Sequence, residues 1–501
     1  MIRALPPAGR TVRCLGPTLI LLLAGAVHAA DTAERGAPAP LPASVAAALE
    51  QAGVADAASA FVVVPLDGGT LRLSHHADTP MNPASTMKLL TTYVALASLG
   101  SNYRWHTEAL AAGPVVGGRL EGDLVVRGGG DPSLVIERWW LLVQRLRALG
   151  IREIRGDLVL DRSRYAPVAD GGATLDGNEL RPYNVAPDAL LINFKAVALT
   201  FVPERGAATA RIAPMPPLDG FKPPATVRLS DGPCGDWHAR LKADFAHPRA
   251  PVFRGSYPRA CGEKTWYLSL LGPDEYALAS FRALWHAAGG VFRGTARTGV
   301  AGAGAQLLVD QESPPLAEVI RDINKNSNNV MARQLFLTLG APLPEAPRSG
   351  TAQPAEGLAH DGGEPASIAR SIARVQAWLA EQGLAMPELV LENGSGLSRQ
   401  ERVSAASLAR LLALAWNGSE MPNFLASLPV AGVDGTMKDR RGAAGSAYVK
   451  TGSLAEVRAL AGYVFAASGR RYAVVALIND PHAEAAQAAH DAFLEWVWKE
   501  G

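Results

Sequence analysis

The chain has 501 residues, of which 48% are hydrophobic, and its 48 basic and 47 acidic residues nearly balance. This length predicts two to four domains, and the hydrophobic content is sufficient for packed cores. There is no basic run and no basic patch interleaved with aromatic residues, so we expect no nucleic-acid partner.

The first 29 residues have the pattern of an export signal. Three arginines precede an apolar run over 15–27, which ends in the small-residue sequence Val27-His28-Ala29. The run is too short to span a bilayer, and no later stretch is long and apolar enough to do so. We therefore expect cleavage near Ala29, a periplasmic location and no stable membrane anchor.

The mature chain is predicted to begin with a helix over 41–52 and a β-hairpin over 61–73. A second helix follows, because Pro83 suits a first helical turn and apolar residues recur over 87–96. Ser85 and Lys88, three residues apart, then share one helical face. A neutral lysine amine can deprotonate a neighbouring serine if burial or nearby charge lowers its pKa. Taken alone, such a pair is more often a chance feature of a surface helix.

A gap of 242 residues separates Ser85 from the next candidate, Ser327. Within it, predicted strands over 124–126 and 158–160 each follow Gly-Asp and flank a helix over 137–149. Short strands broken by Pro and Gly predict a small β module at about 193–267. A further helix is expected over 275–288, and the Pro/Gly/Ala-rich segment 342–365 is expected to be a mobile loop.

Two cysteines remain after signal cleavage, Cys234 and Cys261, and both fall in the predicted β module. An even cysteine count in an exported chain predicts a disulfide between them. Two isolated thiols are the alternative.

The C-terminal part predicts an antiparallel meander over 446–453, 460–465 and 472–478, followed by a helix over 481–499. Lys450-Thr451-Gly452 lies on its first strand. A lysine on an edge strand can hold a substrate carboxylate, and Gly452 allows a substrate backbone to approach for strand-like pairing. An isolated edge lysine is more often a solubility device.

The sequences Ser-x-x-Lys, Ser-x-Asn and Lys-Thr-Gly each occur once, in this order, which is the signature of penicillin-binding proteins and class A β-lactamases. The chain resembles class C low-molecular-mass penicillin-binding proteins of type four, the D-alanyl-D-alanine carboxypeptidase/endopeptidase family of serine peptidases. The resemblance runs from about Ala43 to the C-terminus, and a long insertion between the first two motifs is typical of the family. The other matching segments are Gly122-Asp123-Leu124, 128–134, Asn393-Gly394-Ser395-Gly396-Leu397-Ser398-Arg399 and 431–436.

The resemblance implies an α/β (α+β) fold, with a penicillin-binding-protein/β-lactamase-like transpeptidase domain whose antiparallel sheet is flanked by helices. We expect this catalytic domain to be discontinuous, over 30–103 and 272–501. A large, mostly β insertion over 104–271 is expected to form two smaller domains.

The resemblance also implies a role for each motif residue. Ser85 is the expected nucleophile, Lys88 its base, Ser327 a proton relay and Asn329 a partner of the lysine and the acyl side chain. The middle residue of the second motif is Asn328, where aspartate is frequent, and we expect this change to be tolerated.

The third motif is implied to bind the substrate. Lys450 and Thr451, beside Gly452, are expected to hold its terminal carboxylate, and the N–H groups of Ser85 and Ser453 to form the oxyanion hole. Arg399 is expected to shape the pocket for the stem peptide. Asp176 and Glu179 are only candidates for reading the amino group of a diaminopimelate side chain.

The sequence thus predicts a periplasmic enzyme that trims and un-crosslinks peptidoglycan stem peptides through an acyl-enzyme, with β-lactams as covalent inhibitors. One alternative is a β-lactamase or esterase on the same scaffold, although Glu356 and Glu364 lack the context of a deacylating base. Another is a catalytically idle cell-wall binding scaffold. The histidines, His75-His76 included, show no ligand spacing, so neither a metal nor a cofactor is expected.

Overall fold

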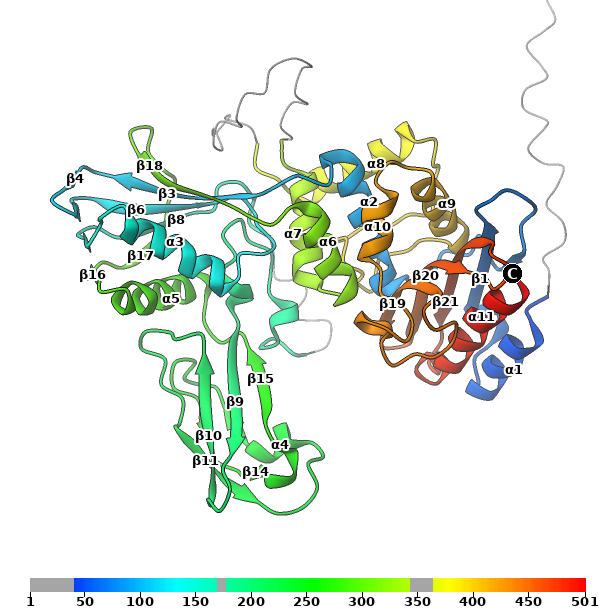
Figure 1. Cartoon of the computed structure of the whole chain (residues 1–501), viewed down its shortest axis with the longest axis horizontal. Coiled ribbons are helices and arrows are strands. Elements are labelled where there is room, and N and C mark those ends of the chain that lie inside the picture. The colour runs from blue at the N-terminus through cyan, green and yellow to red at the C-terminus, as the bar shows by residue number, and fades with distance from the viewer. Residues whose placement is uncertain (1–39, 169–176, 343–363) are drawn as a thin grey trace, which may run out of the picture.

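The computed structural model describes residues 40–168, 177–342 and 364–501. The predicted signal segment and most of the 342–365 loop lie outside these residues. One unit, built from both ends of the chain and called the catalytic unit after the expectation above, lies beside a large insertion (Figure 1). No helix of the described residues is long and apolar enough to cross a membrane.

The catalytic unit is organised around a five-stranded antiparallel sheet in the order β19-β20-β21-β1-β2. It confirms the predicted hairpin and meander. Alternate residues of β1 face opposite sides: Ala60 and Val62 pack against one layer of helices, Phe61 and Val63 against the other. The strands are β19 (Ala447–Leu454), β20 (Val457–Phe465), β21 (Arg471–Asn479), β1 (Ser59–Pro65) and β2 (Leu73–His75).

Helices cover both faces of this sheet. On one side α1 (Ala43–Ala52) and α11 (Gln487–Glu500) pack on each other and on the sheet. They correspond to the helices expected over 41–52 and 481–499. On the other side a helical layer shares one core with α2, the helix after Ser85. This layer consists of α2 (Met87–Leu99), α6 (Leu316–Lys325), α7 (Asn329–Leu339), α8 (Ile368–Glu381), α9 (Ala405–Trp416) and α10 (Met421–Ser427).

The body of the insertion is a five-stranded sheet in the order β17-β8-β6-β3-β18, packed with α3 (Ile136–Ala148) and α5 (Pro273–Ala287). The two Gly-Asp strands pair in parallel and in register, with Leu124 opposite Leu158. A smaller sheet, β16-β7-β5-β4, adjoins it. The strands are β3 (His106–Ala112), β6 (Asp123–Gly128), β8 (Leu158–Asp161), β17 (Ala296–Thr298), β18 (Gln306–Glu312), β4 (Val115–Val116), β5 (Arg119–Leu120), β7 (Glu153–Ile154) and β16 (Val291–Phe292).

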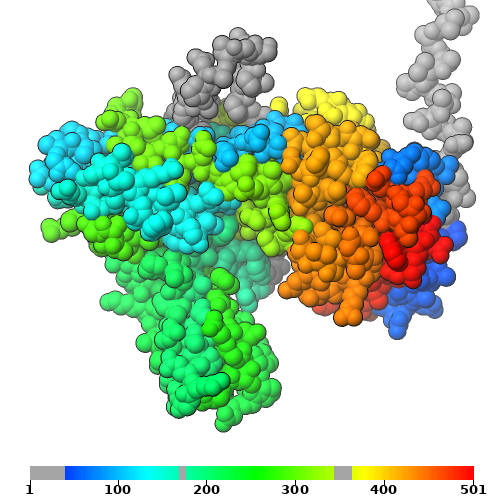
Figure 2. All heavy atoms as spheres, viewed as in Figure 1, coloured from blue at the N-terminus to red at the C-terminus, as the bar shows by residue number. Residues whose placement is uncertain are grey.

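The predicted β module is a second five-stranded sheet, in the order β14-β11-β10-β9-β15. It projects from the body of the insertion (Figure 2). The disulfide between Cys234 and Cys261 forms as expected and closes a loop within it. Its elements are β9 (Val197–Pro203), β10 (Thr209–Met215), β11 (Thr226–Ser230), β14 (Tyr257–Pro258), β15 (Lys264–Leu268), α4 (Trp237–Leu241) and the small pair β12 (Ala243–Asp244) and β13 (Val252–Phe253).

The insertion extends further than the sequence predicted. Strand β18 pairs along its length with β3, and α5 shares the core of the insertion. The chain therefore enters and leaves the insertion on adjacent strands, and the catalytic unit resumes near Ser313, whose N–H donates to the carbonyl of Trp105. The expected boundary at 272 is wrong, because the helical periodicity of α5 cannot show which core the helix joins.

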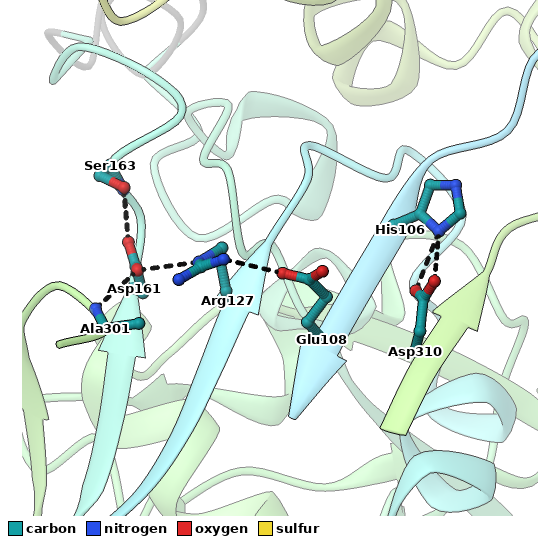
Figure 3. A network of polar contacts seen from close by, with 7 residues as sticks. All are labelled: His106, Glu108, Arg127, Asp161, Ser163, Ala301 and Asp310. Atoms are coloured by element: carbon teal, nitrogen blue, oxygen red, sulfur yellow. Dashed lines mark hydrogen bonds and ion pairs between the residues drawn. The ribbon is translucent and has the colours of Figure 1, made fainter. Parts of the chain in front are cut away.

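A row of charged residues crosses the sheet of the insertion (Figure 3). Asp310, Glu108, Arg127 and Asp161 lie opposite one another on four neighbouring strands. Arg127 pairs with Glu108 at 3.1 Å and with Asp161 at 3.3 Å, and both carboxylates are buried. Because a buried carboxylate without a partner is costly, Arg127 fixes the alignment of three strands.

Candidate active site

Ser85 lies in a 3₁₀ turn, Ala84–Thr86, directly before α2. The side chain of Asn82 holds this turn, since its Oδ1 accepts the N–H of Ala84 and its Nδ2 donates to the carbonyl of Ser398. Ala84 has a φ of 44°, in the left-handed region. The turn places the Ser85 side chain, which is partly exposed, over the first turn of α2 beside Lys88.

Lys88 is fully buried and has three polar neighbours. Its Nζ lies 2.9 Å from Oγ of Ser85, and it donates to Oδ1 of Asn329 at 2.7 Å and to the carbonyl of Ser395 at 2.5 Å. A neutral amine has two N–H groups and one lone pair. The two carbonyl-type acceptors occupy both N–H groups, so the lone pair is left for the hydroxyl of Ser85.

The electrostatic surroundings disfavour the charged form of Lys88. Burial, and then the charge of Lys450, lower the pKa of Lys88 well below its ordinary value, while Glu401 opposes this shift. A lysine can act as a base for serine only if its pKa is lowered. Burial and the charge of a second lysine lower it here.

The second motif forms the turn between α6 and α7. Ser327 has a φ of 54°, and Asn328 is the N-cap of α7, with its side chain accepting the N–H of Met331. A cap needs only an acceptor oxygen, which asparagine supplies as well as aspartate does. Asn329, at the first position of α7, is thereby directed to Lys88.

The third motif lies on β19, which is the edge strand of the central sheet. Lys450 is fully buried, and its Nζ donates to Oγ of Ser327 at 2.8 Å and to the carbonyl of Thr451. Burial lowers the pKa of Lys450 to about 7. The hydroxyl of Thr451 lies 2.8 Å from that of Thr436.

Glycine is required where β19 meets the serine turn. A Cβ on Gly452 would lie 2.9 Å from the backbone N of Ser85 and 2.8 Å from the carbonyl oxygen of Pro83. The next residue, Ser453, is exposed. Strand and turn thus approach closely enough for backbone N–H groups from both to serve one ligand atom.

Three residues to which sequence reasoning assigned no role support this arrangement. The carbonyl of Ser395 accepts from Lys88, and Gly396 packs so tightly on the serine turn that its Cβ would lie 1.8 Å from the Ala84 oxygen. Glu401 is fully buried, and its Oε1 accepts the N–H groups of residues 392, 393 and 394. Burial raises the pKa of Glu401, while these three donors and Lys88 oppose the rise.

Arg399, in the same segment, is exposed and donates to the carbonyl of Ala455 at the β19–β20 turn. It therefore lies at the C-terminal end of β19, beside the turn into β20, and not at Lys88 or Ser327. Glu401 gave no sequence signal, because Arg399-Gln400-Glu401-Arg402 has the composition of an ordinary exposed turn.

The insertion contributes to the same region. A cavity of about 230 Å³ is lined by Tyr183 and Phe194 of the insertion and by residues 326–330 around Ser327. Glu179 is exposed near this segment, and Asp176 lies outside the described residues. The three motifs and part of the insertion thus lie around Ser327. The disulfide lies apart from them, in the projecting β module.

Comparisons with known proteins identify a family and several relatives. Residues 41–355 and 354–499 match the family model described as the D-Ala-D-Ala carboxypeptidase 3 (S13) family. The chain is 25% identical to D-alanyl-D-alanine carboxypeptidase DacB of Haemophilus influenzae, over 84% of this chain and 85% of the relative. It is 28% identical to a D-alanyl-D-alanine carboxypeptidase of an Actinomadura species, over 94% and 87%.

The fold is similar to the crystal structure of penicillin binding protein 4 (dacB) from Haemophilus influenzae. The TM-score is 0.72 at 23% identity, covering 91% of this chain and 99% of that one. A crystal of the same protein complexed with a β-lactam gives a TM-score of 0.67 at 22% identity.

Proposed function

Since the chain belongs to the D-Ala-D-Ala carboxypeptidase 3 (S13) family and is a serine-type peptidase, we propose that it cleaves D-alanyl bonds of peptidoglycan stem peptides through an acyl-enzyme on Ser85. The observation that carries this proposal is the position of the Lys88 amine. It lies 2.9 Å from the serine oxygen, with both of its N–H groups directed elsewhere.

Ser85 Oγ attacks the carbonyl carbon of the D-alanyl bond while its proton passes to Nζ of Lys88. The N–H groups of Ser85 and Ser453 stabilise the oxyanion, an assignment supported by the close approach at Gly452. Ser327 relays the proton held by Lys88 to the leaving amine as the bond breaks, so that the Ser327 hydroxyl is regenerated. Water then attacks the ester, Lys88 accepts a proton from this water and returns one to Oγ of Ser85 as the ester bond breaks, and the acyl product leaves.

Substrate recognition is assigned to the edge of β19. An extended peptide adds to this edge as a strand, and protonated Lys450, with the Thr451 hydroxyl, binds its terminal carboxylate. Tyr183 and Phe194 bound the cavity that would receive the stem peptide side chain. We assign both carboxypeptidase and endopeptidase activity to this site, in the periplasm after removal of the 1–29 signal, with β-lactams as covalent inhibitors.

A dedicated β-lactamase needs a base for rapid deacylation. Glu364 is largely exposed and pairs with Arg370, and Glu356 lies outside the described residues. Glu401, although buried beside Lys88, uses Oε1 for three backbone N–H groups. These positions favour a peptidase with slow drug turnover over the β-lactamase alternative.

The test is covalent labelling by a fluorescent penicillin together with D-alanine release from a D-Ala-D-Ala peptide. Ser85→Ala should abolish the labelling and reduce turnover by about a million-fold, the typical loss of a serine nucleophile. Ser453→Ala is the matched control, because it keeps the backbone N–H and should retain labelling. Labelling of Ser85→Ala, or attachment to another serine in a peptide map, would contradict the mechanism.

A further inference from the structure

Three potential metal ligands gather at the edge of the central sheet that lies opposite the active site. Asp56, His75 and His76 each present one ligand atom, and these atoms lie within 4.8 Å of one another. His75 ends β2, which is separated from β19 by three strands. At the usual strand spacing this is about 19 Å across the sheet, so the cluster is independent of the acylation site.

The backbone at His76 creates the cluster. Adjacent residues of a regular strand point to opposite faces, which is why the pair His75-His76 gave no ligand spacing in the sequence. His76 instead has a φ of 43°, a left-handed conformation that is uncommon for a residue other than glycine. The two rings consequently lie on the same side, with centroids 4.1 Å apart.

The distances from the two imidazoles to the Asp56 carboxylate suit ligands of one ion. Nε2 of His75 is 3.1 Å from Oδ1 of Asp56, and Nε2 of His76 is 3.5 Å from Oδ2. A tetrahedral ion with bonds of 2.0–2.1 Å separates its ligands by about 3.3–3.4 Å. Nε2 of His75 is enclosed and faces the carboxylate of Asp56.

Neighbouring groups orient the ligands. Nδ1 of His76 lies 3.1 Å from the carbonyl of Ser59. A proton on Nδ1 satisfies that carbonyl and leaves the Nε2 lone pair free, which is the usual second contact of a metal-binding histidine. Asp56 follows α1 in the short turn Asp56–Ala58, and its side chain is 69% exposed, so solvent can complete the coordination.

We propose that Asp56, His75 and His76 form a site for a divalent transition-metal ion of the Zn²⁺ class, which ties the end of β2 to the turn before β1. Two imidazoles and one carboxylate are ligands that zinc accepts. The ion has no part in acylation. It holds the edge strand of the sheet in place.

The test uses chain without a histidine tag, stripped of metal with EDTA and then dialysed against Zn²⁺. We expect one zinc per chain by elemental analysis, and a rise in melting temperature on adding Zn²⁺ that EDTA reverses. His75→Gln, His76→Gln and Asp56→Asn should each weaken binding by at least about 10–100-fold, the range known for loss of a group that only supports a ligand. Penicillin labelling should be unchanged in all three.

His106→Gln is the matched control, because His106 also contacts a carboxylate, Asp310 at 2.9 Å, but the described part of the chain gives this pair no third ligand. It should bind zinc as the unaltered chain does. Absence of stoichiometric zinc, or binding that survives His76→Gln in a variant that still reacts with penicillin, would overturn the proposal. So would a loss of zinc caused by His106→Gln.

Discussion

Lys450 has a pKa close to neutrality, so recognition of a carboxylate at this site should depend on pH. In the free enzyme the pKa is about 7, lowered by burial. Below that pH the amine is charged and can pair with a carboxylate, and above it the charge is lost. We therefore expect kcat/KM for a peptide ending in a free carboxylate to fall as the pH rises through about 7, by up to tenfold for each pH unit.

A neutral thioester substrate isolates this effect, because it has no carboxylate for Lys450 to bind. Its kcat/KM should lack the fall, and the ratio of the two substrates measured from pH 5 to 9 gives the apparent pKa of the recognition group. Lys450→Arg keeps its charge at all these pH values and should flatten the ratio. Equal pH profiles for both substrates would show that Lys450 does not read the carboxylate.

Glu401 is expected to be a positioning residue that also sets the charge near Lys88. Glu401→Gln keeps an oxygen for the three backbone N–H groups but removes a negative charge that raises the pKa of Lys88. The pKa of Lys88 should then fall further, and the acid limb of penicillin acylation, where Lys88 becomes protonated, should move to lower pH. Acylation rates measured against pH test this.

Two further variants separate charge from structure at Glu401. Glu401→Ala removes the acceptor of three N–H groups, and a buried unpaired donor costs about 1–3 kcal/mol, so this variant should also melt at lower temperature. Glu392→Gln, exposed in the same segment, should change neither property. If the acid limb does not shift in Glu401→Gln, Glu401 has no electrostatic effect on Lys88.

At the scale of single residues, the motifs predicted side chains that the structure brings together, but not the groups that hold them. Ser85, Lys88, Ser327, Asn329 and Lys450 stand in short motifs whose spacing reflects one helical turn or one strand. Ser395 acts through its backbone carbonyl, which any side chain would supply. Glu401 acts through burial, and burial of a charged residue depends on tertiary packing that no local pattern records.

At the scale of helices and strands, periodicity located most elements to within a few residues. The expected helix over 137–149 is α3, Ile136–Ala148, and the strand expected over 158–160 is β8, Leu158–Asp161. The sequence did not predict which elements pack against one another. The amphipathic pattern of α5 shows that one face is buried, but not that it packs on β16 and β17, which follow it, and on α3, which lies far earlier in the chain.

The strand alignment of the insertion should depend on Arg127. Arg127→Met leaves the buried carboxylates of Glu108 and Asp161 without their shared cation, and removing one partner of a buried ion pair typically costs about 3–5 kcal/mol. We expect a loss of this size in the free energy of unfolding by urea. Penicillin labelling of the folded variant should persist, because the acylating residues lie in the catalytic unit.

Arg119→Met provides the comparison, because Arg119 is a half-exposed residue of the same insertion that pairs with Glu121. An exposed ion pair contributes about 0–1 kcal/mol, so this variant should remain close to the unaltered chain. If the two variants lose the same stability, the charged row of Figure 3 has no special role.

At the scale of the whole molecule, the site is assembled from segments that are far apart in the sequence. The serine turn comes from the N-terminal part, the Ser327 turn from the segment after the insertion, and β19 from the C-terminal part. The insertion reaches the site through Tyr183 and Phe194. A resemblance at the level of motifs predicted the gathering of the three motifs, whereas the aromatic residues are recognisable only from the cavity that they line.

The central sheet joins the two ends of the chain, since Ser59 pairs with Ile478 across β1 and β21. A chain that is synthesised from its N-terminus therefore contains Ser85 for a long period before β19, β20 and β21 are made. The insertion has its own core and can fold during that interval. Lys450 is made near the end, so an incomplete chain carries the serine turn without β19, and the three motifs come together only when synthesis is complete.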